Sequence, residues 1–146
     1  MIDLKWQKRF YTLAEHIAQW SKDPSTKVGA VIADARRRVV SVGYNGFPRH
    51  VRDSPERYED RQTKYSLVVH AEANAILNAP RPVNECALFI TFSPCSACAK
   101  MIVQSGIIQV YAPPPILPED GRPWSEDAAF AKLILAEAGI EIDRPF

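Results

Sequence analysis

The sequence lacks the features that would link a chain by disulfides or fix it in a membrane. Its 146 residues include only three cysteines, which leave no disulfide framework and fit a reducing compartment. No apolar run approaches the length of a membrane span, and the first residues do not follow the basic and then apolar order of a signal peptide. These absences predict a cytoplasmic protein with no membrane partner.

An excess of positive charge is also missing. The formal net charge is +1 and the sequence pI is about 7.7, whereas a protein that holds nucleic acid usually has a basic face and a higher pI. Hydrophobic residues make up 47% and charged residues 24%, as in ordinary soluble proteins. The composition therefore favours a free small molecule over nucleic acid, and the length fits one domain over residues 1–146.

Two short motifs hold the residues that carry chemistry. The first is H-x-E at His70 and Glu72, and the second is P-C-x-x-C at Pro94, Cys95 and Cys98. Zinc favours four tetrahedral ligands, and catalytic zinc sites leave the fourth position to water. His70, Cys95 and Cys98 supply three ligands, which leaves Glu72 as a carboxylate that the metal does not need. We therefore predict a hydrolytic zinc site in which Glu72 takes a proton from water.

The spacing within each motif fits this site if both motifs open helices. Cys95 and Cys98 stand at i and i+3, so they share one face of a turn, where the positive end of the helix dipole favours thiolates. His70 and Glu72 are only two residues apart. Helical side chains lean towards the N-terminus, however, so a long Glu in a first turn can reach a metal held by the His.

A closed structural zinc site is the alternative. Cys86 is a third thiol, and with His70, Cys95 and Cys98 it would complete a Cys3His set. Glu72 and the proline before Cys95 argue against this reading, because a structural site needs neither. Cys86 is explained more simply as a small buried hydrophobe at the start of a strand.

Apolar periodicity predicts an alternating order of helices and strands. The helices are expected over residues 5–20, 70–78, 94–105 and 125–138, and the strands over 28–33, 38–44, 87–92, 107–111 and 140–142. On the last helix, Ala129, Leu133 and Ala136 are expected to share the packed face. The alternation in the second half predicts parallel strands after an antiparallel start. The expected fold class is α/β, with a mixed five-stranded sheet between helical layers.

Residues 45–66 show no helical or strand period, and a loop of that length inside a domain is usually functional. Its basic side chains would suit a substrate phosphate or an effector, because Arg forks match phosphate oxygens. A solvated loop whose acidic residues balance the charge explains the segment equally well. The basic residues are Arg49, Arg52, Arg57, Arg61 and Lys64.

Longer blocks resemble the deoxycytidylate (dCMP) deaminase family, within the zinc-dependent cytidine and deoxycytidylate deaminases. H-x-E followed by P-C-x-x-C is the zinc deaminase signature, with the Glu as general acid and base. The resemblance covers about the first three quarters of the chain, and the final quarter matches poorly. It implies a cytidine deaminase-like three-layer α/β/α fold. The blocks are residues 28–32, 43–48, 70–76, 98–100 and 106–107.

The resemblance implies hydrolytic deamination of dCMP to dUMP and ammonia, which supplies dUMP for thymidylate synthesis. A zinc-activated water is expected to attack C4 of the pyrimidine, while Glu72 relays a proton to N3 and then to the departing amine. By resemblance, Asn45 of the Gly-Tyr-Asn-Gly motif contacts the substrate. Backbone groups around Ala71 and Ser93 are expected to read the edge of the base.

The phosphate contacts are less clearly marked in the sequence. Lys27 or the arginines of residues 45–66 are expected to hold the phosphate. Family members commonly place a Tyr in the loop after the strand at 107–111, where this chain has Arg122, and we expect Arg122 to stand in for it.

The resemblance also implies partners beyond the substrate. These are one zinc per chain, a dCTP effector with magnesium, a dTTP effector, and a homo-oligomer that is a hexamer in the family. Alternative substrates are a 5-substituted dCMP, cytosine or guanine, or the adenosine of a tRNA, although the lack of a basic face argues against tRNA. A non-enzymatic zinc protein that binds nucleotide as a regulator is a further alternative, but it would not need Glu72.

Overall fold

Five strands form one sheet in the order β2-β1-β3-β4-β5. The structure, a computed structural model, describes residues 2–116 and 124–145. The strands are β1 (Gly29–Ala33), β2 (Val39–Tyr44), β3 (Ala87–Ile90), β4 (Gln109–Tyr111) and β5 (Ile142–Asp143). β1 pairs antiparallel with β2 and β3, whereas β3, β4 and β5 run parallel. The predicted mixed five-stranded sheet is therefore confirmed.

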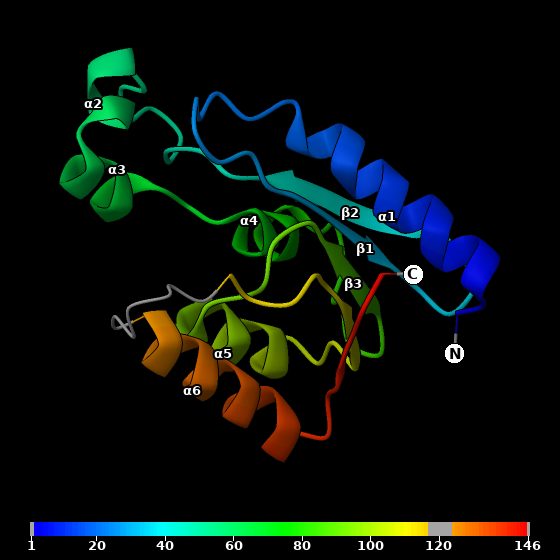
Figure 1. The fold of residues 1–146 in the computed structure, drawn as a ribbon. Coiled ribbons are helices and arrows are strands. Elements are labelled where there is room, and N and C mark those ends of the chain that lie inside the picture. The colour runs from blue at the N-terminus through cyan, green and yellow to red at the C-terminus, as the bar shows by residue number, and fades with distance from the viewer. Residues whose placement is uncertain (1, 117–123, 146) are drawn as a thin grey trace.

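Helices cover both faces of this sheet (Figure 1). The helix α1 lies on one face, and α4, α5 and α6 lie on the other. The helices are α1 (Leu4–Ala18), α2 (Pro55–Glu59), α3 (Arg61–Leu67), α4 (Ala71–Asn78), α5 (Ser96–Gln104) and α6 (Trp124–Glu137). No helix within residues 2–116 and 124–145 is long and apolar enough to cross a membrane.

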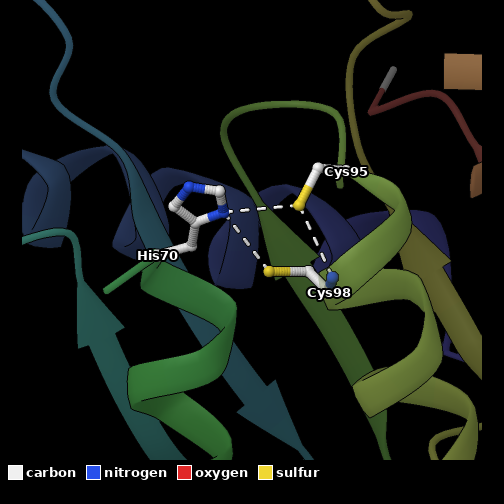
Figure 2. A group of neighbouring side chains, drawn as sticks. All are labelled: His70, Cys95 and Cys98. Atoms are coloured by element: carbon white, nitrogen blue, oxygen red, sulfur yellow. Dashed lines mark hydrogen bonds between the residues drawn. The ribbon is translucent and has the colours of Figure 1, made fainter. Parts of the chain in front are cut away.

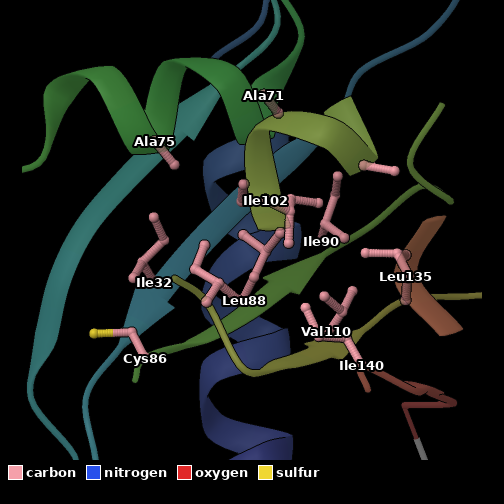
Figure 3. Packing of buried hydrophobic residues seen from close by; sticks show 14 of the residues in the cluster. Ile32, Ala71, Ala75, Cys86, Leu88, Ile90, Ile102, Val110, Leu135 and Ile140 are labelled. Carbon is pink, nitrogen blue, oxygen red and sulfur yellow. The ribbon is translucent and has the colours of Figure 1, made fainter. Parts of the chain in front are cut away.

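The two layers of helices bury two separate apolar clusters. Under α1, Phe10 packs in one cluster with Phe89 and Tyr111 of the sheet. The larger cluster lies on the opposite face, where residues such as Leu88 and Ile102 meet (Figure 3). β1 and β3 are buried along their whole length, which explains why their sequences are continuous apolar runs without alternation.

Glycines allow two helices to lie directly on the strands. A Cβ at Gly29 would come within 2.0 Å of the Ala14 carbonyl oxygen in α1. A Cβ at Gly43 would come within 2.4 Å of the Ala71 carbonyl oxygen and of the Ala75 nitrogen in α4. The absence of a side chain at Gly43 therefore sets how closely the first turns of α4 approach β2.

The segment predicted as a loop, residues 45–66, holds two short helices instead. The helix α2 has five residues and buries Tyr58, and α3 has seven residues and buries Lys64. One buried residue on each helix gives no repeat that a search for periodicity can find. Both helices lie at one end of the molecule, beyond the end of the sheet (Figure 1).

Two details of the later helices also differ from expectation. Ala129, Leu133 and Ala136 are exposed, and α6 instead packs through Ala131 and Leu135. Apolar residues occur on every side of α6, so the pattern could not decide which face is buried. The helix α5 begins at Ser96, so Pro94 lies before the capping residue and not at the first helical position.

Candidate active site

The ends of two helices bring three potential metal ligands together. His70 is the capping residue before α4, and Cys95 is the capping residue before α5. His70 Nδ1 lies 3.5 Å from Cys95 Sγ and 3.3 Å from Cys98 Sγ (Figure 2). The ligand atoms of these three residues all lie within 4.8 Å of one another. Helices from distant parts of the chain thus place one imidazole and two thiols around one point.

This arrangement fits a zinc ion. Tetrahedral zinc, with Zn–S of about 2.3 Å and Zn–N of about 2.0–2.1 Å, separates its nitrogen and sulfur ligand atoms by roughly 3.6 Å. The two distances from His70 Nδ1 to sulfur are 3.5 and 3.3 Å, close to that separation. One nitrogen and two sulfur donors are also a ligand set that zinc prefers, and three protein ligands leave a position for water.

The start of α5 favours a thiolate at Cys95. Its Sγ accepts a hydrogen bond from the Cys98 backbone nitrogen at 3.5 Å, as a capping side chain does. A hydrogen bond from the Cys98 thiol, with His70 close by, lowers the pKa of Cys95 to about 4. The same contact and burial raise the pKa of Cys98. The start of α5 thus favours a thiolate at Cys95, and a zinc ion bound there would displace the proton of Cys98.

Glu72 lies in the first turn of α4 and is only 3% exposed. Burial raises the pKa of its carboxyl group to about 7. A group that titrates near neutral pH can both accept a proton and return it, which is what general acid–base catalysis requires. Glu72 is therefore placed and tuned for proton transfer beside the three potential ligands.

A cavity of about 180 Å³ opens next to these groups. His70, Ala71, Glu72 and Cys95, from the starts of α4 and α5, are among the residues that line it. Apolar side chains form much of the wall, which suits a flat aromatic ring. The remaining lining residues are Asp23, Thr26, Val28, Asn45, Lys64, Tyr65, Val68, Ile90, Phe92 and Ser93.

The thiol of Cys86 does not join the other two cysteines in a closed metal site. Cys86 belongs to the large apolar cluster, where it is 2% exposed (Figure 3). Among the residues that the structure describes, the metal-binding group contains His70, Cys95 and Cys98 and not Cys86. All three cysteines are free of disulfides. Cys86 is thus the buried hydrophobe that the sequence predicts.

Asn45 lies in the cavity wall, and its side chain is 5% exposed. Its Oδ1 accepts a hydrogen bond from the Val28 nitrogen at 2.8 Å, and its Nδ2 donates to the Thr26 carbonyl oxygen at 2.8 Å. The amide therefore fixes the backbone that enters β1. It keeps one N–H and one lone pair with which to contact a bound molecule.

A buried ion pair forms another part of the wall, and sequence reasoning missed it. Lys64 Nζ lies 2.9 Å from Asp23 Oδ2 and donates to Ser25 Oγ at 2.7 Å. Asp23 also accepts from the backbone nitrogens of Ser25 and Thr26. An Asp before Pro24 is a signal for a turn, but the sequence does not pair it with Lys64, which is 41 residues away. Lys64, expected with the arginines of residues 45–66 to hold a phosphate or an effector or to be solvated, is instead buried in this ion pair.

Comparison with known proteins agrees with this site. The family described as "Cytidine and deoxycytidylate deaminase zinc-binding region" matches residues 4–113. The chain belongs to this family. It is 44% identical to an "Uncharacterized deaminase in luxG 3'region" of Aliivibrio fischeri, over 94% of this chain and 92% of that protein. It is 38% identical to the deoxycytidylate deaminase of Homo sapiens, over 94% of this chain and 78% of the human protein.

A solved structure confirms the expected fold. The dCMP deaminase of cyanophage S-TIM5 superposes with a TM-score of 0.73 at 25% identity, covering 98% of this chain and 99% of the phage chain. The deaminase resemblance therefore extends through the final quarter of the chain in structure, although the sequence blocks end earlier.

The remaining residues expected to bind substrate are placed differently from one another in this deaminase. Ser93 and Ala71 line the cavity. Lys27 is exposed, and its Nζ donates to the Ser21 carbonyl oxygen. It is not among the residues that line the cavity. Arg122 lies outside the described residues. Phe92 and Tyr65, which line the cavity and are 39% and 51% exposed, carried no signal in the sequence because isolated aromatics usually mark a core.

Proposed function

We propose that this protein catalyses the hydrolytic deamination of dCMP to dUMP and ammonia. The observation that carries the proposal is that His70, Cys95 and Cys98 meet beside the buried carboxyl of Glu72, and that His70, Glu72 and Cys95 line a cavity. The names of relatives support the substrate, since the human relative is a deoxycytidylate deaminase. The apolar wall, with Val28, Ile90 and Phe92, offers surfaces that can pack on a pyrimidine ring.

The metal would be held by His70 Nδ1 and the sulfurs of Cys95 and Cys98. A zinc ion bound there supplies an activated water, because it lowers the pKa of that water towards neutrality.

Glu72 carries the proton transfers in this proposal. Its carboxylate accepts a proton from the attacking water and passes it to N3 of the pyrimidine as C4 becomes tetrahedral. It then delivers the second proton of that water to the amine, which leaves as ammonia while the C4 carbonyl forms. Burial of Glu72 supports both roles, because it brings the pKa of the carboxyl group to about 7.

Substrate contacts are proposed for the side chain of Asn45 and for backbone groups of Ala71 and Ser93. Their position on the cavity wall supports these roles. For the phosphate we propose Lys27, an exposed residue that directly follows the cavity-lining Thr26 in the chain, and Arg122.

We propose one deaminase domain over residues 1–146, assembly into a homo-oligomer such as a hexamer, activation by dCTP with magnesium and inhibition by dTTP. The family resemblance and the exposed Arg49 and Arg52 on the segment after Asn45 support these effectors. A reducing compartment such as the cytoplasm is proposed because Cys95 and Cys98 must stay reduced to bind zinc.

Ammonia release tests the proposal directly. The zinc-loaded protein is incubated separately with dCMP, 5-methyl-dCMP, cytidine, cytosine, guanine and adenosine, each with and without dCTP. Release from dCMP, faster than from cytidine and the free bases, is the expected result. Release from a base or nucleoside and not from dCMP would refute the substrate, and no release from any of them would refute the activity.

A further inference from the structure

The side chain of Asp127, in the last helix, accepts hydrogen bonds from the turn that contains Cys95 and Cys98. Asp127 lies in the first turn of α6, and α5 and α6 lie side by side (Figure 1). Asp127 Oδ2 accepts a hydrogen bond from the Ser96 nitrogen at 3.1 Å, and Oδ1 accepts one from Ser96 Oγ at 2.5 Å. Both carboxylate oxygens thus bind one residue, and that residue stands directly after Cys95.

The two bonds restrain Ser96 more tightly than one would. Ser96 is the first residue of α5, so its backbone N–H has no partner within the helix. Asp127 gives this N–H a charged acceptor and at the same time holds the hydroxyl group, and charge-assisted hydrogen bonds are stronger than neutral ones. Rotation of the Ser96 backbone would swing Cys95 away from Cys98. The two bonds oppose that rotation.

We propose that Asp127 is a positioning residue for the metal centre, holding the Cys95–Cys98 turn in the geometry that binds the ion. This inference rests on the proposed metal site, and it holds whichever nucleotide or base the enzyme deaminates. Partners that orient metal ligands typically change metal affinity about 10–100-fold when they are removed. The motif search did not find Asp127, because it lies 31 residues from Ser96 in the part of the chain that resembles the family least.

Metal affinity of the full chain measures this role without any substrate. Zinc affinity is determined by competition with a chromophoric chelator for the wild type, Asp127→Ala and Ser96→Ala. We expect Asp127→Ala to weaken zinc binding about 10–100-fold. Ser96→Ala keeps the backbone bond and should lose less. Glu126→Ala is the matched control, because it removes the same charge from the neighbouring, exposed position of α6. It should bind zinc as the wild type does.

The double variant that combines Ser96→Ala with Asp127→Ala tests whether Ser96 and Asp127 act through one contact. If they do, Ser96→Ala adds little to the loss already caused by Asp127→Ala, whereas independent effects would add. Asp127→Glu restores a carboxylate on a longer arm and should recover part of the affinity. Asp127→Asn, which has the same shape and keeps one acceptor oxygen, carries the test if the alanine variant does not fold.

The absorption spectrum of the cobalt-substituted protein separates positioning from a general structural role. Cobalt in a site with two thiolates absorbs in bands that report ligand geometry. At saturating cobalt, a displaced cysteine in Asp127→Ala should shift or weaken these bands, and Glu126→Ala should leave them unchanged. The inference is overturned if Asp127→Ala binds zinc as tightly as Glu126→Ala and keeps the wild-type cobalt spectrum, even if its melting temperature is lower. Failure to release ammonia from dCMP would refute the proposed function but would not alter this ranking.

Discussion

Lys64 places its ammonium group against both carboxylate oxygens of Asp23, 3.1 Å from Oδ1 and 2.9 Å from Oδ2, on the wall of the cavity that contains Glu72. The two side chains are 10% and 1% exposed. The pair joins the short helix α3 to the turn before β1. Neither residue belongs to the two apolar clusters, so this contact is polar and not hydrophobic. It therefore has measurable consequences for both stability and acid resistance.

Replacing Lys64 with Met should destabilise the protein strongly. Met has a similar length, but it leaves the buried carboxylate of Asp23 without its cation, and breaking a buried pair typically costs about 3–5 kcal/mol. The free energy of unfolding is measured in urea. The control is Lys22→Met, which breaks the exposed pair between Lys22 and Asp53 and should leave stability close to the wild-type value. Equal effects of the two substitutions would contradict this account.

The same pair should make stability fall in acid. Burial alone raises the pKa of Asp23, but the hydrogen bonds from Lys64, Ser25 and Thr26 outweigh it and lower the pKa below its ordinary value of 3.8. A carboxyl with a lowered pKa in the folded state stabilises the fold above its unfolded-state pKa, and this contribution is lost as the pH falls through the folded value.

Asp23→Asn should therefore show a smaller loss of stability than the wild type between about pH 5 and pH 2. Urea unfolding at several pH values measures the slope, and the difference between the two proteins cancels the effect of zinc release, which both undergo. Parallel curves for the two proteins would show that Asp23 contributes nothing to acid unfolding.

The parts of the site that lie close together in the sequence could be predicted, and the parts joined only by folding could not. The pairs His70 with Glu72 and Cys95 with Cys98 are each set by the spacing within one turn, which the sequence displays. The contacts of Asp23 with Lys64 and of Ser96 with Asp127 join residues 41 and 31 positions apart. No local rule connects such residues.

The helices and strands also differ in how well the sequence predicts them. Strands buried on both faces and a long amphipathic helix leave clear patterns, so the sheet and α1 were predicted correctly. The helices α2 and α3 are too short for their pattern to repeat, since each buries one residue. For α6, the choice between Leu133 and Leu135 as the buried leucine depends on contacts with α5 and the sheet, which sequence periodicity does not contain.

Glu72→Gln should abolish turnover and leave the metal in place. The amide has the same shape and cannot carry protons from water to the substrate, so we expect at least a 10²–10⁴-fold loss, the usual contribution of a general acid–base group. Ammonia release and zinc content are measured on the same sample. Glu137→Gln, at an exposed position at the end of α6, is the control. Activity of Glu72→Gln close to that of the control would remove Glu72 from the mechanism.

Gly43→Ala should lower both stability and activity. The new Cβ would lie 2.4 Å from the Ala71 carbonyl oxygen and the Ala75 nitrogen, so α4 must move away from β2. Overpacking of this kind costs about 1–3 kcal/mol of stability. The movement of α4 would also shift His70 and Glu72 relative to the cysteines at the start of α5. Urea unfolding measures the loss. Gly46→Ala is the matched control for stability, because among the described residues no atom beyond its two chain neighbours lies within 4 Å of the new Cβ. A loss as large in Gly46→Ala would show that chain entropy, and not the close approach of α4, sets the effect.

Cys86 and Cys98 should behave as opposites when each is changed to Ala. Both are buried thiols, 2% and 3% exposed, but Cys98 Sγ lies 3.3 Å from His70 Nδ1 while Cys86 packs in the apolar cluster. Cys98→Ala removes a metal ligand and should reduce bound zinc well below one per chain. Cys86→Ala should retain zinc and lose only stability, since a small cavity replaces the sulfur. Zinc content after dialysis against a weak chelator, together with urea unfolding, distinguishes the two. Loss of zinc from Cys86→Ala would instead support a closed site with four protein ligands, and such a site would leave no position for the water that deamination requires.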